Sequence, residues 1–319
     1  MGIAILCSGG DAAGMNPAIK KFVDFSYEQG LSPYLIYDGL EGLIDGKIKK
    51  ATYKDVAGII HLGGTIIRSS RSKRFYESNY RAQAYNNLLQ YDIDRIIVLG
   101  GDGSFRAMSV FCSEYNIGFV GIPSTIDNDI YATEYALGVD TALNVIRDAI
   151  DKIKDTASSF NRAFVVEVMG RESGYLAAVS AAISGAEICV IPEVRFEQEK
   201  IEKKLLEEIA KGRNYLLAIV AEGADKTQFV KEWIEERFAL ETRVSVLGHI
   251  QRGGNPTVYD RLMAFEFVIK AIEKLSNEPK TQMMIGYQKG QFVFVDIFEV
   301  VSNKNKLAHH IIENLNYLG

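Results

Sequence analysis

Short apolar runs that end in glycine- or carboxylate-bearing turns alternate with helix-period segments along almost the whole chain. The first run, Ile3 to Cys7, leads through a glycine turn into a helical pattern from about Pro17 to Gln29. Such βα units predict an α/β fold of mostly parallel sheets flanked by helices. Because 319 residues exceed the usual size of a single core, we expect two lobes.

Further apolar runs are candidate strands, separated by helical patterns or loops. They are Tyr34 to Tyr37, Arg95 to Leu99, Gly118 to Ile122, Ala163 to Met169, Ile188 to Ile191 and Tyr215 to Ala221. Helices with one buried face are predicted over Thr141 to Lys154 and Gln198 to Lys211, with Gly212 as a stop signal. The change of pattern near Gly138 predicts a lobe boundary there.

Charge and cysteine usage exclude several classes of protein. A net charge of -5, from 36 basic and 41 acidic residues spread along the chain, indicates neither a nucleic-acid-binding arm nor a membrane-seeking face. Cys7, Cys112 and Cys189 form no CxxC pair, so neither a disulfide framework nor a zinc site is expected. With no signal-peptide pattern and no apolar run of membrane-spanning length, we expect a cytoplasmic protein that binds neither nucleic acid nor membrane.

Two glycine-rich turns follow apolar strands and are candidate phosphate loops. Ser8 to Asp11 precedes a helix, so its backbone amides can approach a phosphate; an empty βα turn is an equal alternative. Gly100 to Ser104 adds a carboxylate among glycines, which favours a metal role for Asp102 over a helix cap.

Carboxylates and arginines follow other strands. The segment Pro123 to Asp129 has two carboxylates two residues apart. One could accept a proton while the other holds a metal ion or water, a division of roles that phosphoryl transfer commonly needs. The alternative is that the segment only forms an Asx-turn. Arg171 follows a strand and suits charge stabilisation, or is a surface residue. The glycine-rich segment Gly248 to Gly254 contains His249 and Arg252, which are candidate hydrogen-bond donors to a phosphate. A parallel sheet collects such loops at one edge, which favours a phosphorylated substrate.

Together these segments resemble the bacterial ATP-dependent 6-phosphofructokinase family over essentially the whole chain. The matching stretches are SGGDAAGMN at 8 to 16, GGDGS at 100 to 104, PSTIDND at 123 to 129, VEVMGR at 166 to 171 and ETRVSVLGHIQRGG at 241 to 254. The resemblance implies transfer of the γ-phosphoryl group of ATP to the 1-hydroxyl of fructose 6-phosphate, a step of glycolysis. It also implies an ATP-binding lobe of residues 1-138 plus 251-301 and a sugar-phosphate lobe of residues 139-250 plus 302-319.

The resemblance assigns roles position by position. Asp127 is the expected general base, with Thr125, Asp129 and Arg171 around the transferring phosphoryl group and Mg²⁺ at Asp102. The residues expected to bind ATP are Gly10, Arg71, Ser72, Gly101, Asp102, Gly103 and Ser104. Those expected to bind fructose 6-phosphate are Thr125, Ile126, Asp127, Arg162, Met169, Gly170, Arg171, Glu222, Arg243, His249, Ile250, Gln251 and Arg252. Arg162 and Arg243 are expected from a neighbouring subunit, which implies a homotetramer.

Several positions depart from the family pattern. Gly103 and Ser124 leave room for a nucleotide where pyrophosphate-using relatives have Asp and Lys, so a pyrophosphate-dependent enzyme is the nearest alternative. Ala107, Leu40 and Tyr76 replace a usual glycine, tyrosine and arginine, with a changed ATP affinity or nucleotide preference as the expected effect.

An allosteric site for ADP is also implied. Its expected residues are Lys154, Gly185, Ala186, Glu187, Lys211, Arg213, Asn214 and Tyr215. Asp24 and Tyr53 stand where arginines are expected, and a carboxylate there repels a phosphate. We therefore expect weak or absent control by ADP and phosphoenolpyruvate. Two more distant alternatives are a NAD or lipid kinase, from the GGDG loop alone, and a catalytically silent regulatory homologue.

Overall fold

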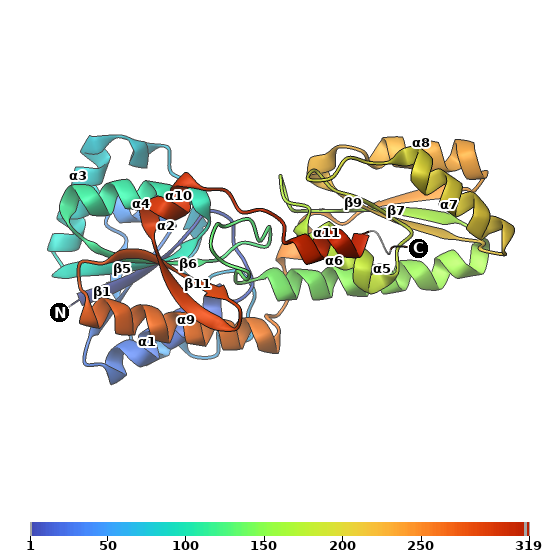
Figure 1. Ribbon diagram of the computed structural model, residues 1–319. Coiled ribbons are helices and arrows are strands. Elements are labelled where there is room, and N and C mark those ends of the chain that lie inside the picture. The colour runs from blue at the N-terminus through green and yellow to red at the C-terminus, as the bar shows by residue number, and fades with distance from the viewer. Residues whose placement is uncertain (1, 316–317, 319) are drawn as a thin grey trace. The chain divides into compact units, whose positions relative to one another are not determined.

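The protein is described by a computed structural model that covers residues 2–315 and 318 (Figure 1). The chain divides into two compact units. The first unit comprises Met1–Asp140 and Arg252–Asn305, and the second comprises Thr141–Gln251 and Lys306–Gly319. Both units are α/β, as the alternation of apolar and helical segments predicts. None of the helices in the described ranges is long and apolar enough to cross a membrane.

The first unit is built on a mostly parallel sheet in the order β12-β11-β6-β5-β1-β2-β3, with β4 pairing with β1. Only the β2/β3 and β11/β12 pairs within the described residues are antiparallel. The strands are β1 (Gly2–Ser8), β2 (Ser32–Ile36), β3 (Ile48–Lys50), β4 (Ser69–Ser70), β5 (Ile93–Gly100), β6 (Gly118–Pro123), β11 (Gln282–Gln288) and β12 (Gln291–Asp296).

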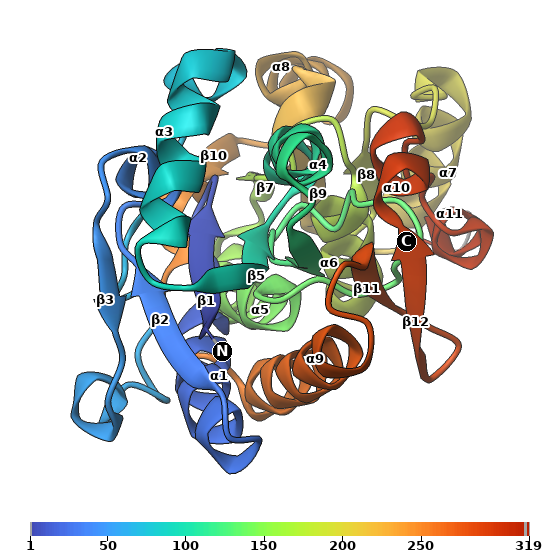
Figure 2. The same ribbon diagram turned by 90° about the vertical axis from the view of Figure 1, so that its left-hand side faces the viewer.

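Helices cover both faces of this sheet, which explains why β1 and β6 are buried along their whole length. Figures 1 and 2 show α1 and α9 on one face and α3, α4 and α10 on the other. The helices are α1 (Met15–Glu28), α2 (Gly39–Ile44), α3 (Ser78–Leu89), α4 (Asp102–Tyr115), α9 (Val258–Asn277) and α10 (Ile297–Ser302). Phe105, Phe111 and Phe119 are fully buried in the core on the α4 side.

A buried carboxylate ties together the two segments by which the chain leaves and re-enters the first unit. Asp260 on α9 accepts a hydrogen bond from the hydroxyl of Tyr135 and another from the Gly138 amide at 2.7 Å. The Thr257 hydroxyl donates to Asp140 Oδ2 at 2.5 Å. Because buried polar groups are costly when unpaired, these bonds fix where the segments around residues 135–140 and 257–260 meet.

The second unit contains a parallel sheet in the order β10-β7-β9-β8. Its core packs Val165, Ala218 and Trp233 together under α7 and α8. The elements are α5 (Val139–Phe160), β7 (Ala163–Val168), α6 (Tyr175–Ser184), β8 (Ile188–Val190), α7 (Gln198–Ala210), β9 (Leu216–Ala221), α8 (Thr227–Phe238), β10 (Thr242–Val246) and α11 (His309–Leu315). Helix α5 begins two residues earlier than predicted and ends six residues later.

Candidate active site

Three neighbouring strands of the first unit end side by side at one edge of the sheet. Cys7 of β1 lies opposite Leu99 of β5, and Gly100 of β5 lies opposite Pro123 of β6. Because adjacent strands are about 4.8 Å apart, the loops that follow them start next to one another. The structure therefore brings together the glycine turn after β1, the GGDGS segment and the PSTIDND segment.

The glycine turn after β1 packs against an arginine from a distant part of the sequence. A Cβ at Gly10 would lie 2.2 Å from Arg252 Nη1, so the guanidinium occupies the space that a side chain would need. Arg252 Nη1 also lies 3.4 Å from the Asp11 carbonyl oxygen, to which it donates, and 3.6 Å from Asp11 Oδ1. Arg252 Nε is buried with no hydrogen-bond partner among the described residues. The structure thus places Arg252 in the first unit, beside the predicted nucleotide loop.

The GGDGS segment runs from the last residue of β5 into the first turn of α4. Gly101 is the N-cap residue and Asp102 is the first helical residue; the Asp102 side chain is 48% exposed and lies 3.3 Å from Arg106 Nη2. The Ser104 hydroxyl donates to Ser8 Oγ at 2.9 Å, which links this segment to the end of β1. A Cβ at Gly103 would meet no atom within 4 Å. Asp102 and Gly103 are therefore accessible at a helix N-terminus, where an anion is stabilised.

The two carboxylates of the PSTIDND segment differ in exposure. Asp127 is only 2% exposed, and its amide donates to Thr125 Oγ1 at 3.2 Å. Asn128 adopts a left-handed backbone (φ 51°) and its side-chain amide donates to the Glu134 carbonyl oxygen at 3.0 Å. Asp129 is exposed. The buried Asp127 and the exposed Asp129 thus have the different surroundings that a division of roles between two carboxylates requires. Ile126 is buried.

Arg71 follows β4, whose two residues pair with Cys7 and Ser8 at the end of β1. The Ser69 hydroxyl donates to the Gly9 carbonyl oxygen at 2.7 Å, so this segment is hydrogen-bonded to the glycine turn. Arg71 is exposed. The hydroxyl of Ser72 accepts from the Phe75 amide at 3.1 Å, so in this structure it orders its own loop.

In the second unit, the loops after β7 and β9 are held together by one carboxylate. Glu222 Oε1 accepts from the Gly170 amide at 3.2 Å and from the Arg171 amide at 2.8 Å. Gly170 (φ 141°) and Arg171 (φ 51°) both have positive φ, and a Cβ at Gly223 would lie 1.6 Å from the Arg171 carbonyl oxygen. The predicted ligand residue Glu222 therefore also fixes the backbone of Arg171.

A glutamine connects the loop after β7 to the loop after β10. Gln251 is 1% exposed; its Oε1 accepts from the Met169 amide at 3.1 Å and its Nε2 donates to the Gly248 carbonyl oxygen at 3.0 Å. His249 and Ile250 lie between these contacts and are exposed. The strand ends of the second unit thus bring together Met169 to Arg171, Glu222 and the His249 to Gln251 segment.

Arg162 and Arg243 lie at the amino-terminal ends of the strands of the same sheet, opposite the loops described above. Arg162 precedes β7, Arg243 lies near the start of β10, and both contact Glu241, with 2.8 Å between Arg162 Nε and Glu241 Oε2. Strand β7 has six residues, so this end of the strands is about 20 Å from the loops that contain Arg171 and Glu222. Within the second unit, these two arginines are therefore not brought together with the other predicted sugar-phosphate residues.

One of the predicted effector residues of the second unit is a buried glutamate, Glu187. Glu187 forms an ion pair with Arg213 and accepts from the Leu217 amide at 2.7 Å. Burial raises the pKa of Glu187, although the Leu217 amide and Arg213 oppose this shift. The Lys154 ammonium donates to the Ser184 carbonyl oxygen at 2.7 Å, next to Gly185 and Ala186. Lys211, Asn214 and Tyr215 follow α7 in the segment around Arg213.

In the first unit, the two positions that depart from the effector pattern have partners of their own. Asp24 forms an ion pair with Lys20 one helical turn earlier. The Tyr53 ring is exposed and lies 5.0 Å from the Tyr27 ring, measured between centroids. Sequence reasoning missed Lys20, although its i,i+4 spacing from Asp24 is a signal for such a pair.

The positions that depart from the family's nucleotide pattern differ in exposure. Leu40 is 3% exposed and belongs to the core cluster, and Ala107 packs against the same cluster. Tyr76 is 68% exposed. The Leu40 side chain is therefore inaccessible in this structure, whereas the Tyr76 side chain is open to solvent.

An open pocket of about 440 Å³ lies in the first unit beside β3, and its lining includes none of the predicted site residues. Its cations already have partners: Lys47 and Arg68 contact Asp38, and Lys49 contacts Asp55. Its lining residues are Tyr37, Asp38, Gly46, Lys47, Ile48, Lys49 and Arg68. The pocket therefore gives no support for a ligand of the predicted reaction.

Comparison with known proteins decides the family. The family model described as Phosphofructokinase matches residues 2–275. The chain belongs to the phosphofructokinase family. An ATP-dependent 6-phosphofructokinase of Sulfurimonas denitrificans is 55% identical over 98% of this chain and 98% of its own length. A second, of a Sulfurovum species, is 57% identical over 97% of this chain and 95% of its own length.

The fold is likewise that of a phosphofructokinase. The solved phosphofructokinase of Saccharomyces cerevisiae superposes with a TM-score of 0.89 at 33% identity over 94% of this chain. This chain spans 45% of the yeast chain. The resemblance that the five sequence segments indicate is therefore confirmed at the level of family and fold.

Proposed function

We propose that this phosphofructokinase is an ATP-dependent 6-phosphofructokinase, a sugar-phosphate kinase of glycolysis. It transfers the γ-phosphoryl group of ATP to the 1-hydroxyl of fructose 6-phosphate and releases ADP and fructose 1,6-bisphosphate. The observation that carries the proposal is the buried Asp127 in the loop after β6, the strand that pairs with β5, which leads into the GGDGS segment. Relatives at 55% and 57% identity that are named for this activity support it.

Asp127 is the proposed general base. Its carboxylate accepts the proton of the sugar hydroxyl as the new O–P bond forms and the bond to the leaving ADP oxygen breaks. Low exposure of Asp127 supports this role because it excludes water that would compete for the proton. Thr125, Asp129 and Arg171 are proposed to surround the phosphoryl group, and the guanidinium of Arg171 neutralises its negative charge.

The two compact units are the proposed lobes for the two substrates. The first unit is the ATP lobe, since its strand edge collects the glycine turn, Arg71 and the GGDGS segment. The second unit is the fructose 6-phosphate lobe, with Met169, Gly170, Glu222 and His249 as sugar contacts. Arg252, in the first unit, is proposed as a further hydrogen-bond donor to a phosphate. Its buried Nε, which has no hydrogen-bond partner among the described residues, supports this role.

The residues at the GGDGS segment fit Mg²⁺ that arrives with ATP. No cluster of three potential ligand residues occurs among the described residues. In kinase sites Mg²⁺ is usually held by one or two carboxylates together with substrate phosphates and water. Asp102 is the proposed protein carboxylate for this ion, since it is half-exposed beside Gly103. The bound ion neutralises phosphate charge.

A second copy of the chain is proposed to complete the sugar-phosphate site. Arg162 and Arg243 lie at the opposite end of the strands from Arg171 and Glu222. In the proposed assembly, Arg162 and Arg243 of a neighbouring copy contact the phosphate of fructose 6-phosphate, which the same residues of the first copy do not reach. A homotetramer, the assembly that the family resemblance implies, provides such neighbours.

The cytoplasm is the proposed location. Burial raises the pKa of the Cys7 thiol to about 12, so this cysteine is unreactive, and the three cysteines are free. Reduced, buried thiols are typical of a reducing compartment.

A donor assay tests the proposed function. The purified chain is given fructose 6-phosphate and Mg²⁺ with ATP, GTP or pyrophosphate, and fructose 1,6-bisphosphate is measured by coupling to aldolase. We expect turnover with ATP and little with pyrophosphate, because Gly103 leaves space beside the phosphates. Turnover with pyrophosphate and none with ATP would refute the assignment of the donor. No turnover with any donor would instead indicate a silent homologue.

A further inference from the structure

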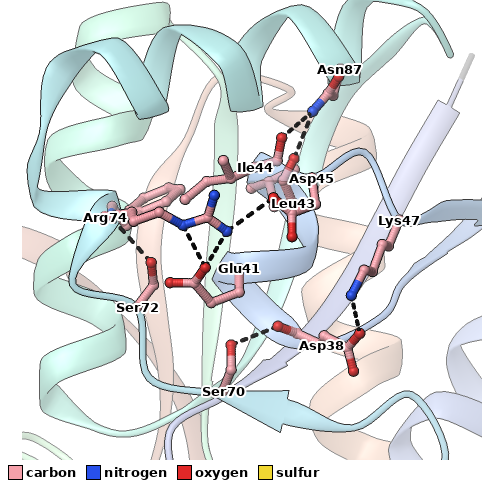
Figure 3. Close-up of polar contacts among 11 residues, drawn as sticks. Asp38, Glu41, Leu43, Ile44, Asp45, Lys47, Ser70, Ser72, Arg74 and Asn87 are labelled. Carbon is pink, nitrogen blue, oxygen red and sulfur yellow. Dashed lines mark hydrogen bonds and ion pairs between the residues drawn. The ribbon is translucent and has the colours of Figure 1, made fainter.

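The segment from Arg71 to Tyr76 (the 71–76 loop) is tied to helix α2 by the side chain of Arg74 (Figure 3). Arg74 Nε donates to Glu41 Oε2 at 2.7 Å, and Arg74 Nη2 donates both to the same carboxylate and to Asp45 Oδ1 at 2.9 Å. Arg74 therefore connects a loop and a helix that are about thirty residues apart in sequence. A guanidinium with several aligned bonds to carboxylates fixes geometry better than a single ion pair does.

Helix α2 is a fixed support for this contact. The helix has six residues and no side-chain hydrogen bond at its N-cap, so it needs contacts from outside. Asn87 Nδ2 donates to the carbonyl oxygens of Leu43 and Ile44 at 3.0 and 2.7 Å (Figure 3). At the other end, the Ser70 hydroxyl donates to the Asp38 carbonyl oxygen at 2.6 Å.

The other end of the loop is tied to α4. Arg81 Nη1 donates to the carbonyl oxygens of Phe75 and Tyr76 at 3.1 and 2.8 Å, and Arg81 pairs with Glu114 of α4. The Phe75 ring is buried and lies 5.3 Å from the Phe111 ring of α4, measured between centroids. The backbone of the loop is thus held on two sides.

What the fixed loop presents to solvent is a cation. Arg71 is exposed, and none of the ion pairs within the part of the chain that the structure describes includes it. Its backbone follows β4, directly beside the glycine turn at Gly9. A guanidinium held there on an ordered backbone loses less entropy on binding a phosphate than one on a mobile loop.

We propose that the Glu41–Arg74–Asp45 contacts position the 71–76 loop and raise the affinity for ATP through Arg71. The inference rests on the proposed function, since it takes Arg71 as a contact to the nucleotide phosphates. Glu41, Arg74 and Asp45 are positioning residues that do not touch the nucleotide.

The first variant is Glu41→Gln, which keeps the shape of the side chain and removes its charge. We expect the KM for ATP to rise about three- to tenfold, with kcat at saturating ATP and the KM for fructose 6-phosphate nearly unchanged. Titration calorimetry with ATP reports the same loss without turnover. Glu273→Gln is the control for loss of a glutamate charge away from the loop: Glu273 forms an ion pair with Lys270 on α9, and its side chain is 46% exposed, against 27% for Glu41.

A double-mutant cycle separates positioning from general stability. If the contacts act through Arg71, Glu41→Gln adds no further loss of ATP affinity in an Arg71→Gln background. Arg74→Lys retains the charge and is expected to keep more of the affinity than Arg74→Gln. If Glu41→Gln lowers the melting temperature too far for assay, the comparison of Arg74→Lys with Arg74→Gln tests the positioning role instead.

The outcomes separate this proposal from the proposed function. An unchanged KM for ATP in a folded Glu41→Gln, or an effect that adds fully to that of Arg71→Gln, would overturn the positioning role while the kinase assignment stands. A wild-type chain that does not phosphorylate fructose 6-phosphate with ATP would overturn the proposed function first, and the positioning role with it.

Discussion

Gly103 is one of the two residues, with Ser124, at which the choice of phosphoryl donor can be tested. It lies in the first turn of α4, and a Cβ there would meet no atom within 4 Å. A side chain is therefore tolerated by the fold, so its effect on activity reports on the ligand.

We predict that Gly103→Asp raises the KM for ATP about tenfold or more, because a carboxylate beside the phosphates repels them. Gly103→Asn is the matched control, since it has the same size without the charge, and its KM should rise less. Steady-state kinetics with both variants make the comparison. Equal KM values for the two variants would show that charge at this position does not govern ATP binding.

At the scale of elements, most of the sheet was predictable from the sequence. The strands over Arg95 to Leu99 and Gly118 to Ile122 were predicted nearly to the residue, because strands buried on both faces are continuous apolar runs. The β11–β12 hairpin was missed. Its signal is the Lys289-Gly290 turn, in which both residues have positive φ, between two alternating segments.

The sequence indicated which loops follow strands, but not the side-chain contacts between distant segments. The packing of Arg252 against Gly10 and the bonds from Arg74 to α2 join residues far apart in sequence. No local propensity encodes such pairs, so family resemblance supplied the role of Arg252 and gave no role to Arg74. The two-residue strand β4 was missed because two serines have no apolar pattern.

The contact between α2 and the 71–76 loop should depend on pH. The hydrogen bonds from Arg74, and then the contact with Ser72, hold the pKa of Glu41 below its ordinary value of 4.5. A carboxyl whose folded-state pKa is lowered contributes stability above its unfolded pKa, and this contribution is lost as pH falls through the folded value.

We predict that the wild-type chain melts at a higher temperature than Glu41→Gln near pH 7, and that the difference shrinks as pH falls below 4.5. Thermal unfolding of both proteins across this range measures it. A difference that stays constant with pH would mean that the charge of Glu41 is not responsible.

At the scale of the whole molecule, the positions of Arg162 and Arg243 lead to a prediction about assembly. Arg243→Ala and Asp127→Asn should each lose most of the activity when pure. When the two variants are dissociated, mixed and reassociated, some sites combine an intact Asp127 with an intact Arg243 from the neighbouring copy. We predict that activity returns in the mixture, measured by the aldolase-coupled assay. If the mixture is shown to form oligomers of both variants and no activity returns, each active site is made by a single chain.

Regulation is the second property of the whole molecule that can be tested. Asp24 forms an ion pair with Lys20 where the family's effector pattern expects a cation to contact phosphate. We predict that ADP does not activate the purified enzyme at low fructose 6-phosphate, because the Asp24 carboxylate repels its phosphates and occupies Lys20. Initial rates measured with and without ADP test this, and clear activation would contradict it.

The most direct test of the account is the turnover of Asp127→Asn beside the wild type. Formation of fructose 1,6-bisphosphate from ATP and fructose 6-phosphate is measured for both proteins under saturating substrates. We predict a fall in kcat of roughly 10²-fold or more with an unchanged fold, since the amide cannot accept the hydroxyl proton. A variant that turns over at nearly the wild-type rate would contradict the assignment of Asp127 as the base and the mechanism that depends on it.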